Sequence, residues 1–148
     1  MVHHAIEHKV RWSEVDPAGI VFYPRFFEWF DLATEALFDS LGLPWVEIFP
    51  KYRVVGVPIV ESGARFTSPV RYGDHVRIRS TVTEVKDKTF RVEHEVNVGE
   101  RPCARGFEVR AWVKRPVTPG GALYAASIPA EVRQRLGAEP ARATDTPC

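Results

Sequence analysis

Three segments in the second half of the chain alternate between apolar and polar residues, and this pattern most constrains the fold. They span residues 76–83, 90–98 and 107–113. A period of two marks strands that bury one face, which is typical of antiparallel sheets. Short turns lie beside or between the strands, at residues 73–74, 87–88 and 99–100. The second half of the chain is therefore predicted to form an antiparallel meander.

One long helix is predicted over residues 24–41. Pro24 suits the first helical position, because the N–H group that proline lacks would be unpaired there. Apolar residues then recur at spacings of three and four, which places them on one helical face. They are Phe26, Phe30, Ala33, Leu37 and Leu41. Gly42 and Pro44 follow where a helix commonly ends. Residues 6–12 are expected to form a first strand, and residues 129–136 a second, short helix.

A strand, a long helix and several antiparallel strands in this order predict an α+β fold, in which the apolar helix covers one face of the sheet. The other sheet face is expected to be polar and partly solvated. In this interpretation Phe107 and Val109 face the core, whereas Arg77, Arg79 and Arg110 point outward. The edge strands are left open, so edge-to-edge pairing in a dimer is a natural way to cover one of them.

Length and composition fit one globular domain. The chain has 148 residues, of which 45% are hydrophobic and 26% are charged. A formal net charge of +1 gives no indication of a nucleic-acid-binding surface. We expect a domain over residues 1–137 and a flexible tail, rich in alanine, proline and threonine, over residues 138–148.

The remaining compositional features predict a cytoplasmic protein. Cys103 and Cys148 are the two cysteines, which does not point to a disulfide framework. No basic segment followed by an apolar run opens the chain, and no stretch has the length of an apolar membrane span. His3, His4 and His8 stand without a carboxylate or cysteine at ligand spacing, so no metal site is expected.

Asp16 stands in a turn just before the predicted long helix. Pro17 and Gly19 supply the turn, since proline fixes one backbone dihedral and glycine frees another. The first N–H groups of a helix have no internal partners and carry partial positive charge, so they stabilise an anion or a developing oxyanion. A carboxylate beside such donors can attack a carbonyl carbon or activate water as a general base. The alternative is that Asp16 serves only as a turn or capping residue.

The residues that continue from Asp16 resemble the loop-to-helix signature of the hotdog-fold 4-hydroxybenzoyl-CoA thioesterase family. They read Asp16-Pro17-Ala18-Gly19-Ile20-Val21-Phe22-Tyr23-Pro24. The resemblance continues through Trp29, Asp31 and residues 42–44 and 55–60, and it covers most of the chain up to about residue 116. The family implies an antiparallel sheet of about five strands wrapped around one long helix. It also implies dimers, commonly paired as tetramers, with CoA thioesters bound at subunit interfaces.

The resemblance assigns roles within the loop. Asp16 takes the place of the family's catalytic aspartate, and the backbone N–H of Tyr23 takes the place of the donor that polarises the thioester carbonyl. Gly19 of the same string is a candidate substrate-binding residue. The reaction needs no metal and no cofactor. Whether Asp16 attacks the carbonyl carbon, giving a mixed anhydride, or activates water is left open.

Asp31 is a candidate contact for the acyl group. The resemblance gives it the place of an aspartate that lies near the aromatic acyl end in the hydroxybenzoyl subgroup. It equally fits a solvated helix face, because Glu28, Glu35 and Asp39 form an acidic stripe with it at spacings of three and four.

The CoA phosphates have a candidate site at a turn. The family's basic cluster falls on Lys86, Lys88 and Thr89, where Asp87 departs from the family's pattern. Two lysines on a hairpin are also typical of a plain solvated turn. The arginines expected on outward strand faces are equal candidates, and these are Arg77, Arg79, Arg91 and Arg110.

Three function classes follow. The first is hydrolysis of an aryl-CoA such as 4-hydroxybenzoyl-CoA. The second is hydrolysis of an aliphatic acyl-CoA or acyl carrier protein thioester. Some relatives of this second class carry a histidine at the position of Pro24, so the proline here favours the first class. The third is a non-catalytic acyl-CoA-binding protein, against which the retention of Asp16 argues. A hydratase on the same fold usually needs a histidine paired with an acid, and no such pair stands in this loop.

Overall fold

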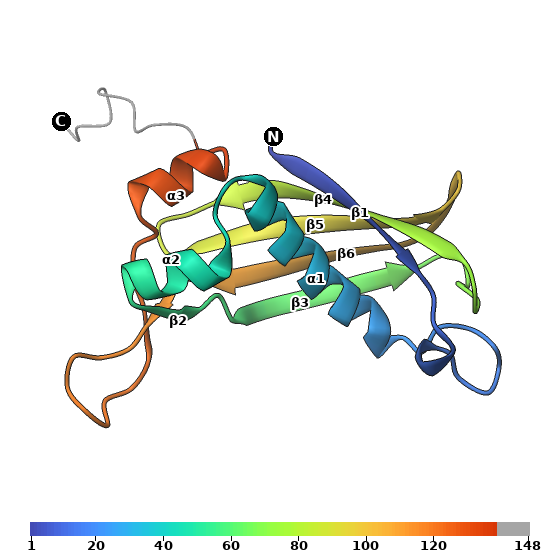
Figure 1. The fold of residues 1–148 in the computed structure, drawn as a ribbon, viewed down its shortest axis with the longest axis horizontal. Coiled ribbons are helices and arrows are strands. Elements are labelled where there is room, and N and C mark those ends of the chain that lie inside the picture. The colour runs from blue at the N-terminus through green and yellow to red at the C-terminus, as the bar shows by residue number, and fades with distance from the viewer. Residues whose placement is uncertain (139–148) are drawn as a thin grey trace.

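The structure is a computed structural model that describes residues 1–138. One antiparallel sheet of five strands forms the body of the molecule, and the helix α1 (Pro24–Ser40) lies across one face of it (Figure 1). In their order across the sheet the strands are β1 (His3–Lys9), β4 (His75–Val85), β5 (Thr89–Val98), β6 (Arg101–Ala111) and β3 (Ile59–Phe66). This confirms the predicted α+β architecture of about five strands around one long helix.

α1 begins and ends close to the predicted bounds. Pro24 occupies its first position, and Gly42 beyond its end has a φ of +71°, a left-handed conformation that favours glycine. Most of the predicted apolar stripe is buried, namely Phe26, Phe30, Ala33 and Leu37. Gly106 on β6 lets the helix approach the sheet, because a Cβ atom there would clash with the ring of Phe30.

The meander of the second half is confirmed, since β4, β5 and β6 are antiparallel neighbours. The first strand is displaced from its predicted place: β1 spans His3–Lys9, whereas the sequence pattern favours residues 6–12. The chain leaves the sheet early because the backbone N–H of Arg11 donates to the side chain of Glu14 at 2.8 Å, and Trp12–Glu14 forms a single 3-10 turn.

A layer of short elements closes one end of the sheet. The helix α2 (Trp45–Tyr52) was not predicted, and neither was a small sheet of β2 (Val54–Gly56), β7 (Val113–Lys114) and β8 (Tyr124–Ala125). The helix α3 (Ala130–Arg135) confirms the short helix expected near residues 129–136. Figure 1 shows this layer and the β4–β5 turn at one end of the molecule, and the start of α1 at the other.

The expected tail over residues 138–148 lies, from residue 139 onward, outside the described residues. Within residues 1–138, no helix has both the length and the apolar character that a membrane crossing requires.

β6 presents charged residues to the core, so the predicted sidedness of this strand is wrong. Glu108 and Arg110 are buried beneath α1, whereas Phe107 and Val109 lie half-buried on the outer face. The inward charges are tolerated because they pair, with Nε of Arg110 donating to Oε2 of Glu108 at 3.0 Å. On the outer face, the guanidinium of Arg91 covers the Phe107 ring at 4.1 Å from its centre. Arg110 is therefore not available to phosphate at an outward face.

β3 is an edge of the main sheet. It pairs with β6 on one side, and no strand within residues 1–138 pairs with its other side. Val60 and Phe66 on this strand are 61% and 46% exposed. A long edge with exposed apolar side chains is a surface that another strand readily covers.

Candidate active site

The loop between β1 and α1 folds back on itself around Asp16. Val15 and Val21 form an antiparallel bridge, and the N–H of Asp16 donates to the carbonyl of Ile20 at 2.9 Å. The N–H of Gly19 closes the inner turn on the carbonyl of Asp16, also at 2.9 Å. Gly19 has a φ of +80° in open surroundings. Backbone conformation, rather than lack of space, therefore requires glycine at this position.

The carboxylate of Asp16 is held at one oxygen and free at the other. Its Oδ1 accepts a hydrogen bond from the backbone N–H of Ala18 at 2.8 Å, which fixes the side chain against the loop. Its Oδ2 has no hydrogen-bond partner in the part of the chain that the structure describes, and the residue is partly exposed. One carboxylate oxygen is thus available to a substrate or a water molecule.

The backbone N–H of Tyr23 is a free donor at the start of α1. The N–H groups of Arg25 and Phe26 donate to the carbonyls of Phe22 and Tyr23, at 2.9 and 3.2 Å, and Pro24 has no N–H group. Among residues 1–138, the N–H of Tyr23 donates to no backbone carbonyl and to no side chain. Because a helix N-terminus carries partial positive charge, this donor is suited to polarise a carbonyl oxygen.

The bridge between Val15 and Val21 brings these two groups into one short segment. Asp16 follows Val15 directly, and Tyr23 follows Val21 by two residues. The same loop therefore offers a carboxylate oxygen and an N–H group that both lack protein partners. Such a pair suits attack on, or hydration of, a carbonyl group.

Glu14 anchors this loop from inside the fold. Its buried carboxylate accepts hydrogen bonds from Nε1 of Trp29 on α1 at 2.6 Å and from the backbone N–H of Arg11 at 2.8 Å. Nε2 of His8 on β1 lies 2.8 Å from the same carboxylate. Burial favours the neutral acid, but these contacts outweigh burial and lower the pKa of Glu14 below its ordinary value. The sequence gives no signal for this role, because only the folded chain brings the partners of Glu14 together.

An apolar groove of about 370 Å³ opens beside the start of α1. It lies between the helix N-terminus and the end of β3, where the ring centres of Phe26 and Phe66 are 4.9 Å apart. Its walls are Ile20, Val21, Tyr23, Phe26, Phe66, Thr67, Ser68, Pro69 and Val70. The groove suits the apolar part of a substrate whose carbonyl oxygen lies at the N–H of Tyr23.

Asp31 lies about two turns further along α1 and is not a plain member of a solvated stripe. Its Oδ1 accepts a hydrogen bond from Nη2 of Arg110 at 2.6 Å, while its side chain remains 54% exposed. By contrast, Glu35 and Asp39 have no ion-pair partner within residues 1–138.

Lys86, Lys88 and Thr89 lie at the opposite end of the sheet from Asp16. They belong to the turn between β4 and β5, whereas the loop of Asp16 bridges through its Ile20 to the segment that precedes β4. The 11 residues of β4 span roughly 35 Å. Both lysines are exposed. Within one chain, the structure does not bring these three residues together with the loop.

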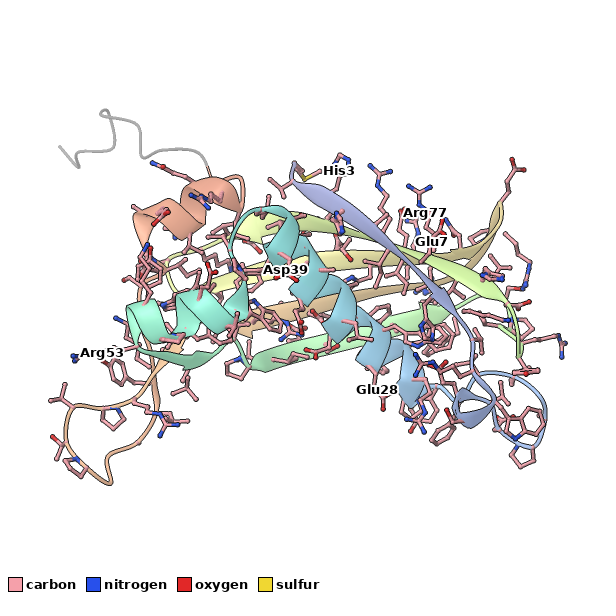
Figure 2. The ribbon with its side chains drawn as sticks, in the orientation of Figure 1. His3, Glu7, Glu28, Asp39, Arg53 and Arg77 are labelled. Atoms are coloured by element: carbon pink, nitrogen blue, oxygen red, sulfur yellow. The ribbon has the colours of Figure 1, made fainter. Side chains whose placement is uncertain are left out.

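A further group of cations at that end was not predicted. Arg53, Lys114 and Arg115 line a groove of about 700 Å³ with the rings of Phe49 and Tyr124, and no carboxylate lines it. Figure 2 shows Arg53 at the left of the molecule beyond α2, and Glu28 well to the right of it near the start of α1. The cations come from segments far apart in the sequence, so their spacing could not reveal the groove.

Two histidines have structural partners. His94 is buried, with its Nδ1 2.7 Å from the hydroxyl of Ser80 and its ring stacked on that of Phe30. His8 is engaged with Glu14. No group of three or more histidine, cysteine, aspartate or glutamate side chains within residues 1–138 is arranged to hold a metal ion.

Comparison with known families covers most of the chain. The family model described as the thioesterase-like superfamily matches residues 10–136. The chain belongs to the thioesterase-like superfamily. The match includes the loop of Asp16, the long helix and all of the second-half meander.

Two relatives illustrate the sequence similarity. The 4-hydroxybenzoyl-CoA thioesterase of Pseudomonas sp. (strain CBS-3) is 32% identical over 93 residues, which cover 62% of this chain and 66% of that protein. The 1,4-dihydroxy-2-naphthoyl-CoA hydrolase of Synechococcus sp. (strain CC9311) is 30% identical over 108 residues, which cover 69% of this chain and 71% of that protein.

Solved structures confirm the hotdog fold. The 4-hydroxybenzoyl-CoA thioesterase of Pseudomonas sp. strain CBS-3 matches with a TM-score of 0.82 and 28% identity, over 91% of this chain and 99% of that one. A gentisyl-coenzyme A thioesterase matches with a TM-score of 0.77 and 35% identity, over 90% of this chain and 98% of that one.

Proposed function

We propose that the protein hydrolyses an acyl-CoA thioester to a free acid and CoA, with Asp16 as the nucleophile or the general base. The observation that carries the proposal is the pair of unpartnered groups in one loop, Oδ2 of Asp16 and the N–H of Tyr23. The relatives named above are thioesterases and hydrolases of CoA thioesters. A protein that only bound acyl-CoA would not need a carboxylate beside an electrophilic carbonyl.

Two routes use the same geometry. In one, Oδ2 of Asp16 attacks the carbonyl carbon, the carbon–sulfur bond breaks, CoA leaves as a thiolate, and water hydrolyses the mixed anhydride. In the other, Asp16 takes a proton from a water molecule that attacks the carbonyl carbon, and the departing thiolate takes up a proton. In both routes negative charge develops on the carbonyl oxygen, where the N–H of Tyr23 stabilises it.

The acyl group of the proposed substrate is aromatic and hydroxylated, and Asp31 contacts it. The relatives act on 4-hydroxybenzoyl-CoA, gentisyl-CoA and 1,4-dihydroxy-2-naphthoyl-CoA, and all three acyl groups carry ring hydroxyls. The aromatic and apolar walls of the groove beside Tyr23 suit a flat ring. Asp31 offers a partly exposed carboxylate further along α1, and a second copy of the chain would bring this carboxylate to the groove.

The complete site forms between two copies of the chain, which pair antiparallel through the open edge of β3. This strand runs from Ile59, beside the layer of α2 and β2, to Phe66, which lines the groove at Tyr23. In a two-fold pair of antiparallel strands, the Ile59 end of one lies beside the Phe66 end of the other. The turn between β4 and β5 that carries Lys86 and Lys88, called the lysine turn below, lies at the Ile59 end of each chain. In this pair, the lysine turn of the partner therefore lies toward the loop of Asp16. Lys86, Lys88 and Thr89 would bind the CoA phosphates across this interface, and two such dimers would form a tetramer.

Thiol release from a panel of CoA thioesters tests the proposal. The panel holds 4-hydroxybenzoyl-, gentisyl-, 1,4-dihydroxy-2-naphthoyl-, benzoyl- and hexanoyl-CoA. We expect the highest kcat/KM with a hydroxylated aryl substrate. A preference for hexanoyl-CoA would favour the aliphatic alternative instead. Binding of the thioesters without hydrolysis of any would contradict the proposal and favour a binding protein.

A further inference from the structure

Arg110 is held on three sides beneath α1. Its Nε and Nη2 donate to the two carboxylate oxygens of Glu108, at 3.0 and 3.1 Å, and its Nη1 donates to the carbonyl of Val57 at 3.0 Å. Glu108 is fixed in turn by the hydroxyl of Thr34, which donates to it at 2.7 Å. A fourth hydrogen bond of the guanidinium runs from Nη2 to Asp31 at 2.6 Å. The guanidinium therefore has one orientation, and it imposes a matching orientation on Asp31.

Asp31 is the exposed end of this network. Its side chain is 54% exposed, whereas those of Arg110 and Glu108 are 5% and 1% exposed. Buried ion pairs contribute little net stability, because loss of hydration offsets their attraction, so stability alone does not explain the arrangement. We propose that Arg110 is a positioning residue, which holds Asp31 as a fixed hydrogen-bond acceptor for a hydroxyl group on the acyl ring. This inference rests on the proposed function.

The surroundings of Asp31 define the chemical class that it accepts. Its Oδ1 is engaged by Arg110, whereas its Oδ2 has no partner within residues 1–138. An ionised carboxylate only accepts hydrogen bonds, so the ligand must supply the donor. Trp45 adds an aromatic wall, since its ring centre lies 5.8 Å from Cζ of Arg110 and 5.6 Å from the stacked ring of Phe49. A fixed acceptor beside aromatic rings fits a phenolic acyl group and repels one with its own carboxylate.

The network lies where a substrate held by the partner's loop would reach it. Val57 lies two residues before the start of β3, and Ile59 pairs with Arg110, so Arg110 and Asp31 lie toward the Ile59 end of that strand. In the proposed dimer, this end lies beside the catalytic loop of the partner chain. Within one chain, Asp31 follows Tyr23 by eight residues, about 12 Å along the helix axis. That separation is longer than a benzoyl ring with its hydroxyl, which favours the contact across the interface.

The test compares hydrolysis of 4-hydroxybenzoyl-CoA and benzoyl-CoA by the full chain and its variants. The readout is the ratio of the two kcat/KM values, which a loss of stability does not change because both substrates meet the same enzyme. We expect Asp31→Asn to lower this ratio about tenfold, as for a lost hydrogen bond to a charged group. Arg110→Lys keeps the charge but not the fork of donors, so it lowers the ratio in the same direction. The double variant lowers the ratio no further than Asp31→Asn alone.

Controls separate the inference from the function on which it rests. Asp39→Asn, on the same helix and without an ion-pair partner in the described chain, should keep the wild-type ratio. An unchanged ratio in Asp31→Asn overturns the inference even where Arg110→Lys fails to fold. Additive effects in the double variant overturn it too, because Arg110 would then act without Asp31. Either result leaves the proposed function standing if the wild type hydrolyses both substrates, whereas failure to hydrolyse any thioester of the panel overturns both.

Discussion

Glu108 and Arg110 stand two residues apart on β6 and face the core together, joined by hydrogen bonds of 3.0 Å from Nε to Oε2 and 3.1 Å from Nη2 to Oε1. Burial by itself raises the pKa of Glu108. The contacts with His94 and Arg110 and the charge of Arg110 outweigh burial and hold the pKa at about 2. The core therefore contains a charged carboxylate that depends on its partners.

This pair predicts a pH dependence of stability. The pKa of Glu108 lies below its ordinary value of 4.5. Its ionised form therefore stabilises the fold above that pH, and the contribution is lost as the pH falls toward 2. The contribution is on the order of 3 kcal/mol. We expect the urea midpoint of the wild type to fall more steeply below pH 4.5 than that of a Glu108→Gln, Arg110→Met variant, which leaves no buried charge unpaired. Equal slopes in the two proteins would contradict this assignment.

Gly19 should be required for catalysis as well as for the turn. Its φ of +80° is shared by Gly120, which lies in the distant loop between β7 and β8, and neither position crowds an added Cβ. Alanine at either site costs roughly 1 kcal/mol of backbone strain. We expect Gly19→Ala and Gly120→Ala to lower Tm alike, but only Gly19→Ala to lower kcat, by about tenfold or more, because it moves Asp16. Equal kcat values in the two variants would show that the conformation of the Asp16 loop does not affect catalysis.

The β3 edge predicts the assembly of the protein. Val60 on this edge is 61% exposed in the single chain, and Val117 in the loop between β7 and β8 is 94% exposed. We expect the wild type to sediment as a dimer or larger, Val60→Glu to sediment as a monomer with little activity, and Val117→Glu to match the wild type. A monomeric wild type would refute the assembly. A fully active Val60→Glu monomer would show that one chain completes the site.

The lysine turn predicts a change in KM. Replacing Lys86 and Lys88 by glutamate should raise the KM for acyl-CoA about tenfold with little change in kcat, and the effect should shrink at high salt. Arg53→Glu with Arg115→Glu tests the neighbouring basic groove in the same assay. The control is Lys9→Glu, because Lys9 is an exposed lysine on β1, at the edge of the sheet opposite β3. If only the groove variant raises KM, the phosphates bind at the groove and the role assigned to the lysine turn is wrong.

Features that depend on local spacing were predictable from the sequence. The apolar stripe from Phe26 to Leu37 and the proline at the start of α1 predicted both bounds of the helix to within one residue. This was possible because helical periodicity and helix ends depend on residues close together in the sequence. The meander followed in the same way from alternation. The family resemblance of the string from Asp16 to Pro24 also identified the loop that carries the candidate site.

Features that depend on distant partners were not predictable. Arg110 and Asp31 are 79 residues apart in the sequence, and their pairing turns a residue expected on the outer face into a buried one. Glu14 acquires its role from Trp29, which lies 15 residues further along the chain. The helix α2 has only 8 residues and contains Pro50, so its periodicity is too short to recognise.

The most direct test of the account is the kcat of Asp16→Asn for the best substrate of the panel, with Asp39→Asn as the matched control on α1. Asparagine at position 16 keeps the size of the aspartate side chain and can still accept the hydrogen bond from the N–H of Ala18, but it removes the negative charge. The fold and KM should therefore change little. We predict that kcat falls at least about a hundredfold in Asp16→Asn and stays at the wild-type value in Asp39→Asn. A kcat for Asp16→Asn equal to that of the wild type would contradict the assignment of Asp16 as the nucleophile or general base.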